Sequence, residues 1–277
     1  MLFALPQLTH LRVAMVNDWH LFEPKDNEEE DLSYTMNVTH LVLSCKSPMG
    51  PALKEIVSWP KRLWSFRLFI DSRSHDPAID RRGPFDVVDT LHSQRLSLEE
   101  LIITERCKPC LALTNSHRSN TNLGEFLALK WVGLPKSCLI PPDLRSQSGL
   151  SPSEMSLPSS LETLRIALSD EYKYDIYNRY ASSTLEAGRQ IEENMAKVNE
   201  GVCLWLMDLT RCREKNKGAL KKVEVWFAYA YDGSQVAERD AMVLRECIVE
   251  KGVAGVLKKM RVSVELCVRG SRAVRKC

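Results

Sequence analysis

The sequence has almost no excess of charge of either sign: 38 Lys and Arg residues against 36 Asp and Glu residues give a formal net charge of +2. A surface that tracks nucleic-acid phosphates usually shows as a clear basic excess, so bulk electrostatics argue against nucleic-acid binding. The sequence also has no run of the ~18 to 20 uncharged apolar residues that a bilayer span requires. Residues 1–15 carry neither a basic n-region nor a small-residue cleavage site, so we expect neither secretion nor membrane insertion.

Cysteines are neither numerous nor regularly spaced. There are 9 of them, an odd number scattered over 277 residues, unlike the disulfide framework of a small secreted domain. We therefore expect a reduced protein of the cytoplasm or nucleus. One motif, Cys107-Lys-Pro-Cys110 followed by His117, resembles half of a zinc site. Such a site usually needs two pairs, and no second pair exists, so we interpret these cysteines as small hydrophobic loop residues and expect no metal.

Fingerprints of catalysis and nucleotide binding are also missing. The sequence contains no GxSxG, HExxH, P-loop or GxGxxG motif. No nucleophile has an identifiable base and a group that would orient that base. We therefore expect neither enzymatic activity nor a cofactor, and a hydrolase on an α/β core is the least supported alternative.

What the sequence does contain is a repeat. Hydrophobic residues make up 44% of the chain and charged residues 27%, which is the balance of a globular protein. A pattern recurs along it: an apolar residue, two variable residues, an apolar residue, one variable residue and a third apolar residue. This is the strand signature of a leucine-rich repeat. The copies are Leu8-Leu11-Val13, Val38-Leu41-Leu43, Leu63-Phe66-Leu68, Leu98-Leu101-Ile103, Leu129-Val132-Leu134 and Leu161-Leu164-Ile166, with weaker copies at Leu220-Val223-Val225 and Leu257-Met260-Val262.

The spacing and alternation of these copies predict the fold. Their central residues are 30, 25, 35, 31, 32, 59 and 37 residues apart, close to the ~20 to 29 of ordinary leucine-rich repeats but longer. Side chains alternate along a strand, so Leu41 and Leu43 are predicted to point into a core while His40 and Val42 point outward. One short strand cannot bury its apolar side alone, so neighbouring repeats stack as a parallel sheet. The predicted fold is an α/β leucine-rich-repeat solenoid, with a curved parallel sheet on the concave face and helices and long loops on the convex face.

Helices are predicted in the crossovers between strands. Residues 50–59 have Pro near the start and place Leu53, Ile56 and Val57 at helical spacing. Residues 84–92 repeat this design.

The spacing of the repeats changes after Ile166. We therefore divide the chain into a repeat array over 1–168 and a second part over 169–277 that is continuous with the array. The second part is predicted to contain a helix-rich insertion over 184–217, a strand at 223–227, a helix over 236–250 and a last strand near 261–267, as irregular repeats or an end cap. Residues 141–160, which contain Pro, Ser and Gly, are predicted to be a loop that projects from the array.

Outward-facing strand positions give a candidate binding surface. His10 and His40 occupy the same position of two repeats and are predicted to stack, and Trp131 and Arg165 are predicted to share one surface. Trp, Phe and Arg dominate binding hot spots because each removes much surface from water or makes forked hydrogen bonds. The alternative is that Trp131 or Trp226 merely caps the core. Val42 and Ile102 are predicted to project from the same face. The candidate binding residues are His40, Arg67, Phe69, Glu100, Trp131, Arg165, Glu224, Trp226 and Arg261.

Two stretches resemble a known family. Residues 122–142 and 156–168 look like the leucine-rich-repeat region of filamentous-fungal F-box-type proteins, in which an apolar-Pro pair leads through a loop to an LP-x-SLE-x-L strand. The resemblance covers roughly residues 1–170 in style. The matching positions are Leu129, Leu134 and Pro135, then Leu157, Pro158, Leu161, Glu162 and Leu164.

Membership of this family implies a substrate-recruiting subunit of a Skp-cullin-type ubiquitin ligase, with the repeats gripping the substrate. The chain departs from the family in one respect. An F-box would be an N-terminal helical module opening with an LP-x-E-type motif, and we find none; the first repeat begins almost at Met1. We interpret the chain as truncated or as a relative without an F-box.

The sequence therefore predicts a non-enzymatic scaffold that binds another protein through its concave face. One alternative is the ligase adaptor, whose protein partner is a ubiquitin-ligase substrate. Another is an RNA-binding or regulatory factor that uses residues 217–277, where 13 Lys and Arg residues face 7 Asp and Glu residues. That alternative predicts steeply salt-dependent binding.

Overall fold

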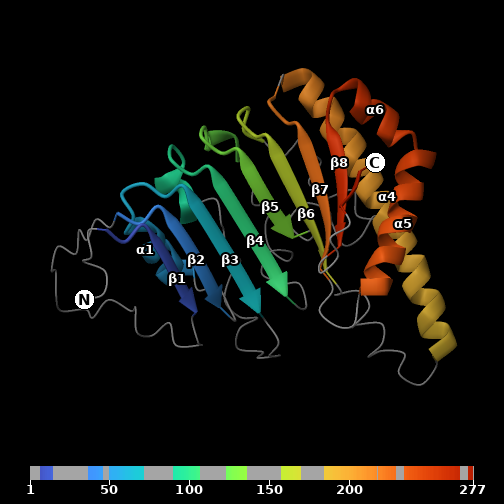
Figure 1. Ribbon diagram of the computed structural model, residues 1–277, viewed down its shortest axis with the longest axis horizontal. Helices are drawn as coiled ribbons and strands as arrows, with labels where there is room; N and C mark the ends of the chain where they lie inside the picture. Colours follow the sequence, from blue (N-terminus) through green and yellow to red (C-terminus); the bar gives the residue numbers. More distant parts are fainter. Residues whose placement is uncertain are drawn as a thin grey trace.

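The computed structural model describes residues 7–14, 37–45, 50–71, 90–106, 123–135, 157–169, 184–216, 218–228, 234–268 and 274–276. They form one β-sheet with helices packed along one side of it (Figure 1). Among these residues, no helix has both the length and the apolar character needed to cross a membrane.

The sheet has nine strands, and their order across it is their order in the chain. Neighbouring strands from β1 to β8 pair in parallel, and β9 pairs antiparallel with β8. The predicted α/β class and parallel sheet are therefore confirmed. The strands are β1 (His10–Ala14), β2 (His40–Cys45), β3 (Ser65–Asp71), β4 (Glu100–Arg106), β5 (Trp131–Pro135), β6 (Thr163–Ser169), β7 (Lys222–Ala228), β8 (Ser263–Val268) and β9 (Val274–Lys276).

The register lines up the apolar positions of the repeat in rows across the sheet. Leu41 pairs with Phe66, and Leu43 pairs with Leu68. All four side chains are at most 1% exposed, and burial of a side chain of this size contributes roughly 1.5 to 3 kcal/mol. Residues one position further along each strand point to the opposite face, so the sheet has one buried side. The central row is Leu11, Leu41, Phe66, Leu101, Val132, Leu164, Val223 and Val264.

A repeated hydrogen-bond pattern joins the chain where each strand begins. The Thr39 carbonyl accepts two backbone N–H groups, from Trp64 and Ser65, at 2.7 and 3.0 Å. Because both donors belong to the next strand's entry, each carbonyl fixes the position at which the next strand starts. Six carbonyls each accept two N–H groups in this way: those of Thr9, Thr39, Trp64, Glu99, Lys130 and Glu162.

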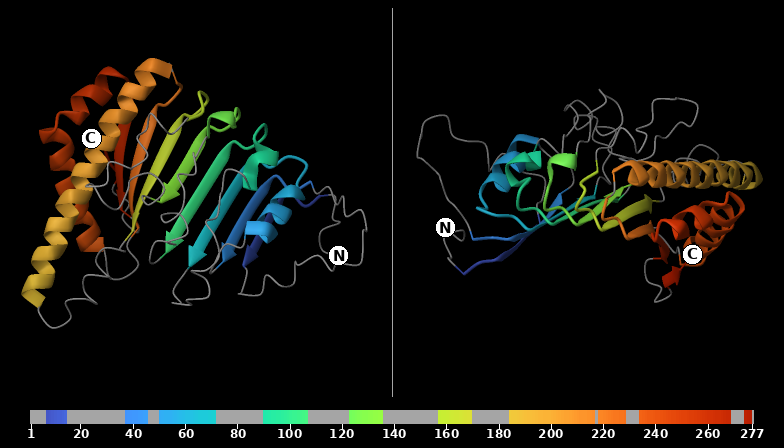
Figure 2. Two further views of the ribbon diagram at one scale, coloured as in Figure 1. Left: turned by 180° about the vertical axis from the view of Figure 1, so that it is seen from behind. Right: turned by 90° about the horizontal axis from the view of Figure 1, so that it is seen from above.

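The helices lie on the buried side of the sheet, and the sheet bends so that its helix-free side is the inner one (Figure 2). Leu53, Ile56 and Val57 of α1 are at most 2% exposed, as their helical spacing predicted. The helices are α1 (Gly50–Ser58), α4 (Thr184–Asn216), α5 (Ser234–Glu250) and α6 (Val253–Lys259), with short 3-10 turns η3 (His92–Gln94) and η5 (Leu123–Glu125). The predicted helices over 50–59, 184–217 and 236–250 are confirmed, whereas α6 and β9 were not predicted.

The buried amide of Gln94, on η3, binds the backbone between the end of α1 and the start of β3. Gln94 is 4% exposed, and its amide nitrogen donates to the carbonyls of Val57 and Pro60 at 3.1 and 2.9 Å. Its amide oxygen accepts the N–H of Leu63 at 3.0 Å and the hydroxyl of Ser97 at 3.1 Å. Both donors and both lone pairs of the amide are therefore used.

The end of the last parallel repeat differs from the prediction. Met260 was expected at the centre of the last strand, but Val264 holds that place by pairing with Val223. Arg261 was expected on the strand and instead ends α6, with φ of 57°. Its N–H bonds to the Lys258 carbonyl at 3.1 Å, and the next N–H bonds to the Leu257 carbonyl at 3.0 Å. This pair of bonds is a Schellman motif, which needs a left-handed residue at this position.

Three expectations fall wholly or mainly outside the described residues. They are the Cys107, Cys110 and His117 motif, most of the predicted helix over 84–92, and most of the loop over 141–160. Within the second of these, Leu91 is described and fully buried.

Candidate binding surface on the open face of the sheet

The side of the sheet on which no described helix lies, here called the open face, carries the side chains that alternate with the core rows. Alternate residues of each strand contribute, and parallel register places them in rows that run across β1 to β8. Eight of the nine predicted site residues occupy these rows: His40, Arg67, Phe69, Glu100, Trp131, Arg165, Glu224 and Trp226. Arg261 does not, because it precedes β8 as the end of α6.

The centre of the open face is an arginine between two tryptophans. The guanidinium carbon of Arg165 lies 4.3 Å from the ring centroid of Trp131 and 4.0 Å from that of Trp226. Both distances are within the range of a cation–π contact. Trp131 is on β5, Arg165 on β6 and Trp226 on β7, so the stack joins three neighbouring strands. The prediction that Trp131 and Arg165 share one surface is confirmed.

The stack depends on the register and on a glycine. Arg165 pairs with Gly133, so Trp131 is its diagonal neighbour on one side. Trp226 pairs with Ala167 and is the diagonal neighbour on the other side. Gly133 has no side chain, and a Cβ built there would lie 3.5 Å from the Trp131 ring and 3.7 Å from Cβ of Arg165. The Trp131 ring and the base of the Arg165 side chain therefore pack beside a strand position that has no side-chain atoms.

Tryptophans 131 and 226 are part of this surface and do not cap the core. Both are partly exposed, and neither belongs to the buried cluster between the sheet and the helices. The alternative that they merely close the core is therefore wrong.

Glu224 binds two members of the stack, Arg165 and Trp226. Its Oε2 accepts from Nε of Arg165 at 2.8 Å and from the indole N–H of Trp226 at 2.9 Å. Its Oε1 lies 2.7 Å from Nζ of Lys222, which also lies 2.7 Å from a carboxylate oxygen of Glu265. The network contains two cations and two carboxylates, so its charges balance.

These contacts set the charge of the network at neutral pH. Burial acts to raise the pKa of Glu224, but the hydrogen bonds from Lys222, Trp226 and Arg165 outweigh it and lower that pKa. Hydrogen bonds to Glu224 and Glu265 raise the pKa of Lys222. Both groups therefore stay ionised well on either side of neutral pH.

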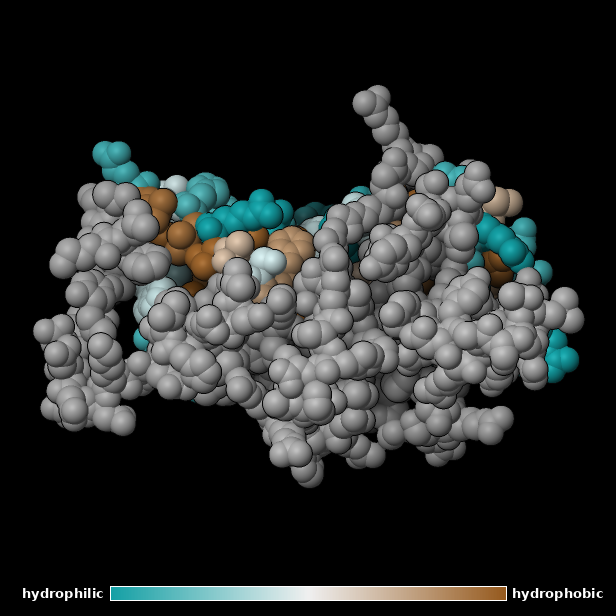
Figure 3. Space-filling view, turned by 90° about the horizontal axis from the view of Figure 1, so that it is seen from below, coloured by the Kyte–Doolittle hydropathy of each residue, from teal (hydrophilic) through white to brown (hydrophobic). Residues whose placement is uncertain are grey.

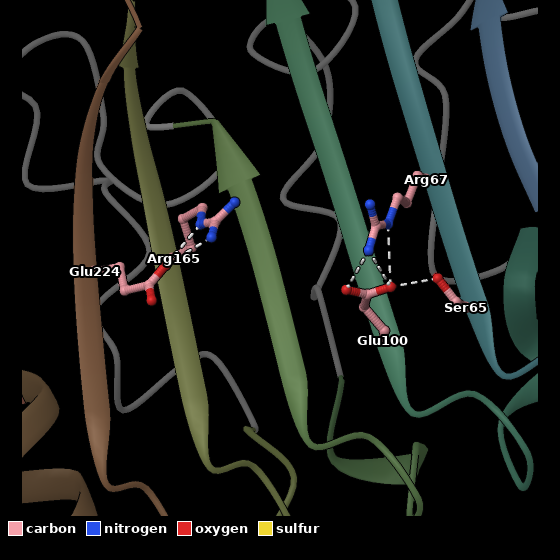
Figure 4. Close-up of polar contacts among 5 residues, drawn as sticks. All are labelled: Ser65, Arg67, Glu100, Arg165 and Glu224. Atoms are coloured by element: carbon pink, nitrogen blue, oxygen red, sulfur yellow. Dashed lines mark hydrogen bonds and ion pairs between the residues drawn. The ribbon is translucent and has the colours of Figure 1, made fainter. Parts of the chain in front are cut away.

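A second polar cluster lies on β3 and β4, in the half of the sheet nearer the N-terminus (Figure 4). Arg67 donates to the carboxylate of Glu100 through Nε at 3.1 Å and through Nη2 at 3.0 Å. The hydroxyl of Ser65, which is 5% exposed, donates to the same carboxylate. The side chain of Arg67 is 45% exposed, and Phe69, two residues further along the strand, is 38% exposed.

Histidines occupy the first two strands of the open face. The rings of His10 and His40 stack with centroids 4.1 Å apart and planes 9° apart, so the predicted stacking is confirmed. Hydroxyls of Thr9 and Thr39 lie within hydrogen-bond distance of the respective Nδ1 atoms. The ring of Trp64 meets His40 edge-on, with centroids 6.3 Å apart.

The arrangement can bind by contact, because the charges of Arg67, Arg165 and Lys222 are already paired with carboxylates within the face. Hydrophilic and hydrophobic residues lie side by side over the described part of the surface in Figure 3. Ile102 is 8% exposed and separates the Arg67 cluster from Gly133 and the tryptophan stack. Among the described residues, no group of three or more His, Cys, Asp or Glu side chains is placed to hold a metal ion.

Two members of the network were not predicted: Lys222 and Glu265. Lys222 directly precedes the apolar Val223, so strand alternation alone could have placed it on the open face. Glu265 was missed because the last repeat was centred on Met260 and not on Val264. The alternation in Ser263–Val268 is the signal that would have found it.

Comparison with known proteins adds no relative. The chain matches no protein-family model, no curated protein and no solved structure.

Proposed function

We propose that the chain is a leucine-rich-repeat solenoid that binds another protein through its open face. Three features support the solenoid: strands follow one another across the sheet in chain order, helices lie on one side of it, and six successive strand entries share one hydrogen-bond pattern. In such arrays each repeat buries its apolar residues mainly against its neighbours.

The observation that carries the binding proposal is the stack of Arg165 between Trp131 and Trp226. Trp and Arg are the residue types most enriched among interface hot spots. Here they are held before any partner arrives, because Glu224 fixes the guanidinium and the indole N–H of Trp226. Binding of a partner then costs less side-chain entropy, because these side chains are already ordered, and association is weakened less.

A protein fits this surface better than a nucleic acid. Phosphate recognition needs cationic groups that are free to meet phosphate oxygens. On the open face Lys222 contacts two carboxylates, and Arg67 and Arg165 each contact one. Arg67 and Phe69 add an exposed cation and an exposed ring for peripheral contacts, as in the mixed rim of a protein interface.

The test is comparative affinity capture from the source cells, with the tagged chain as bait. Two baits join the wild type: Trp131→Ala, which removes one side of the stack, and Leu204→Ala as a matched control. Leu204 is 50% exposed on α4, away from the open face. A partner of the open face is captured by the wild type and by Leu204→Ala. Binding of that purified partner to Trp131→Ala is weaker by about 30-fold or more, the loss typical of a hot-spot residue.

Partners recovered equally by all three baits contradict the proposal. Circular dichroism and thermal melting of each bait show that a loss of binding is not a loss of folding. Recovery of Skp and cullin subunits with the wild type would instead support the ligase-adaptor role implied by the family resemblance. Capture of RNA that disappears steeply between 50 and 200 mM salt, as phosphate-driven binding does, would support the nucleic-acid alternative.

A further inference from the structure

Two cysteine thiols face each other between the helices of the C-terminal half. The Sγ atoms of Cys203 on α4 and Cys247 on α5 lie 3.3 Å apart. Cys203 is 1% exposed, whereas Cys247 is partly exposed and both are reduced. Nothing in the binding surface on the open face uses this pair.

We propose that Cys203 and Cys247 are a redox modification site, which a small-molecule disulfide of the glutathione type converts into a disulfide that joins α4 to α5. The sulfur atoms of a disulfide are about 2.0 Å apart, so these two need to approach by only about 1.3 Å. Among described cysteines, this is the pair whose sulfur atoms are in contact.

A nearby ion pair joins the same two segments of the chain. Glu200 lies one turn before Cys203, and Lys251 lies one turn after Cys247. Nζ of Lys251 is 3.1 Å from a carboxylate oxygen of Glu200. Both of its side chains are about half exposed, so this ion pair adds only weakly to the contact between the two segments.

The environment of the two thiols sets the order of the exchange. Burial, with the hydrogen bond to Cys247, raises the pKa of the Cys203 thiol to about 12, so Cys203 is protonated at neutral pH. It donates its S–H to the sulfur of Cys247, and Cys247 is the thiol of the pair that glutathione disulfide can reach from solvent. The more exposed Cys247 is therefore the first nucleophile.

The reaction proceeds by two exchanges. The Cys247 thiolate attacks one sulfur of glutathione disulfide, forms a mixed disulfide and releases one glutathione thiolate. Cys203 then loses its proton to solvent, and its thiolate attacks Sγ of Cys247 and releases the second glutathione. Two protein thiols are oxidised and one glutathione disulfide is reduced to two glutathione molecules, so atoms and electrons balance.

The cross-link has a structural consequence because of what lies between the two cysteines. The closed loop contains β7, which carries Glu224 and Trp226 of the binding surface. Closing a loop of this length lowers the entropy of the unfolded chain. The oxidised protein is therefore more stable than the reduced one. Its disulfide joins the helix before β7 to the helix after β7, and so restrains the strand that carries Glu224 and Trp226.

The experiment incubates the purified chain with mixtures of glutathione disulfide and glutathione, then blocks free thiols with N-ethylmaleimide. Trypsin places the two cysteines in separate peptides, residues 198–211 and 246–251, each with a single cysteine. We expect these peptides to be linked under oxidising conditions and separate after reduction. We also expect oxidation to raise Tm by about 5 °C or more, and linkage to form faster as pH rises, because Cys203 must lose its proton.

Cys203→Ser and Cys247→Ser, with Cys203→Ala as a second variant at the buried position, should abolish both the linked peptide and the rise in Tm. Cys212→Ser, on the same helix, should change neither. Melting under reducing conditions shows that each variant is folded. Persistent glutathione on Cys247 without the linked peptide would overturn the proposal, as would the same rise in Tm in Cys203→Ser.

Discussion

Arg165 on β6 and Glu224 on β7 are register partners, and Nη2 of Arg165 lies 2.8 Å from Oε2 of Glu224. The same carboxylate binds Lys222 and the indole of Trp226. One side chain that is only 10% exposed therefore binds the cation at the centre of the stack and two of its neighbours. Removal of this carboxylate is the most direct perturbation of the open face.

Glu224→Ala should destabilise the fold by about 3 kcal/mol, because it leaves the partly buried guanidinium of Arg165 without a carboxylate and removes one of the two carboxylates that contact Lys222. Urea unfolding measures this. The matched control is Glu162→Ala, whose partner Lys221 lies 3.1 Å away with both side chains well exposed; its loss should change the free energy of unfolding by less than about 1 kcal/mol. Equal effects of the two substitutions would contradict the role given to Glu224.

Substitutions of Gly133 test whether the missing side chain beside Trp131 and Arg165 matters for binding. A Cβ at this position makes ordinary contacts of 3.5 to 3.7 Å with Ile102, Trp131 and Arg165, so Gly133→Ala should be tolerated. Gly133→Leu should displace Trp131 and the guanidinium, because its larger side chain needs the space they occupy. Binding of the captured partner should weaken at least 10-fold in Gly133→Leu and stay within 2-fold in Gly133→Ala. Equal binding by both variants would show that the stack is not the contact site.

Much of the fold could be predicted from the sequence, because the repeat places an apolar residue at each buried strand position. The triplets around Leu41, Phe66 and Val132 predicted both the strands and the side each residue faces. The last repeat could not be placed this way, since Leu257, Met260 and Val262 match the triplet equally well at the end of a helix. The left-handed conformation of Arg261 hides the boundary, because a helix end of this type usually carries glycine.

The candidate site was predictable as a set of residues but not as a set of contacts. Alternation alone assigned Trp131, Arg165 and Trp226 to one face. Their stacking depends on the register between strands that are 32 and 59 residues apart at their central positions, and on the gap at Gly133. Register is fixed by the whole array of entry hydrogen bonds, which no single repeat encodes.

Arg261→Gly should stabilise the protein. A non-glycine residue in the left-handed region is strained, and at φ of 57° the replacement by glycine should add about 0.5 to 1 kcal/mol to the free energy of unfolding. Arg261→Val should destabilise it instead, because a β-branched side chain tolerates this region least. Thermal melting measures both effects. A higher Tm for Arg261→Val than for Arg261→Gly would refute the prediction.

Gln94→Leu should be among the most damaging single substitutions in the first half of the chain. The leucine is of similar size but leaves the Leu63 N–H and the carbonyls of Val57 and Pro60 without their partner. Each unsatisfied buried group costs about 1 to 3 kcal/mol, so the loss should reach at least about 3 kcal/mol in urea unfolding. The neutral control is Ser93→Ala, because the neighbouring Ser93 is exposed. Similar losses in the two variants would contradict the role given to the buried amide.

Acidification should weaken the first repeats through His40. Burial and then the neighbouring His10 lower the pKa of His40 below its ordinary value of 6.5; Arg67 also lowers it, and Glu100 opposes them. The unfolded chain therefore binds a proton at a higher pH than the folded chain does. It follows that the stabilisation is complete above pH 6.5 and is lost as pH falls from there toward the folded pKa.

His10→Gln should raise the pKa of His40, because the stacked ring 4.1 Å away can no longer place a second positive charge beside it. The pKa should stay below 6.5, since the burial of His40 is largely unchanged. Titration of the His40 ring protons by NMR measures both values, and His92→Gln is the control because His92 pairs with Glu125 and not with the stack. An unchanged His40 midpoint in His10→Gln would mean that the stacked histidines do not interact electrostatically, and the acid sensitivity would then have to come from burial and from Arg67.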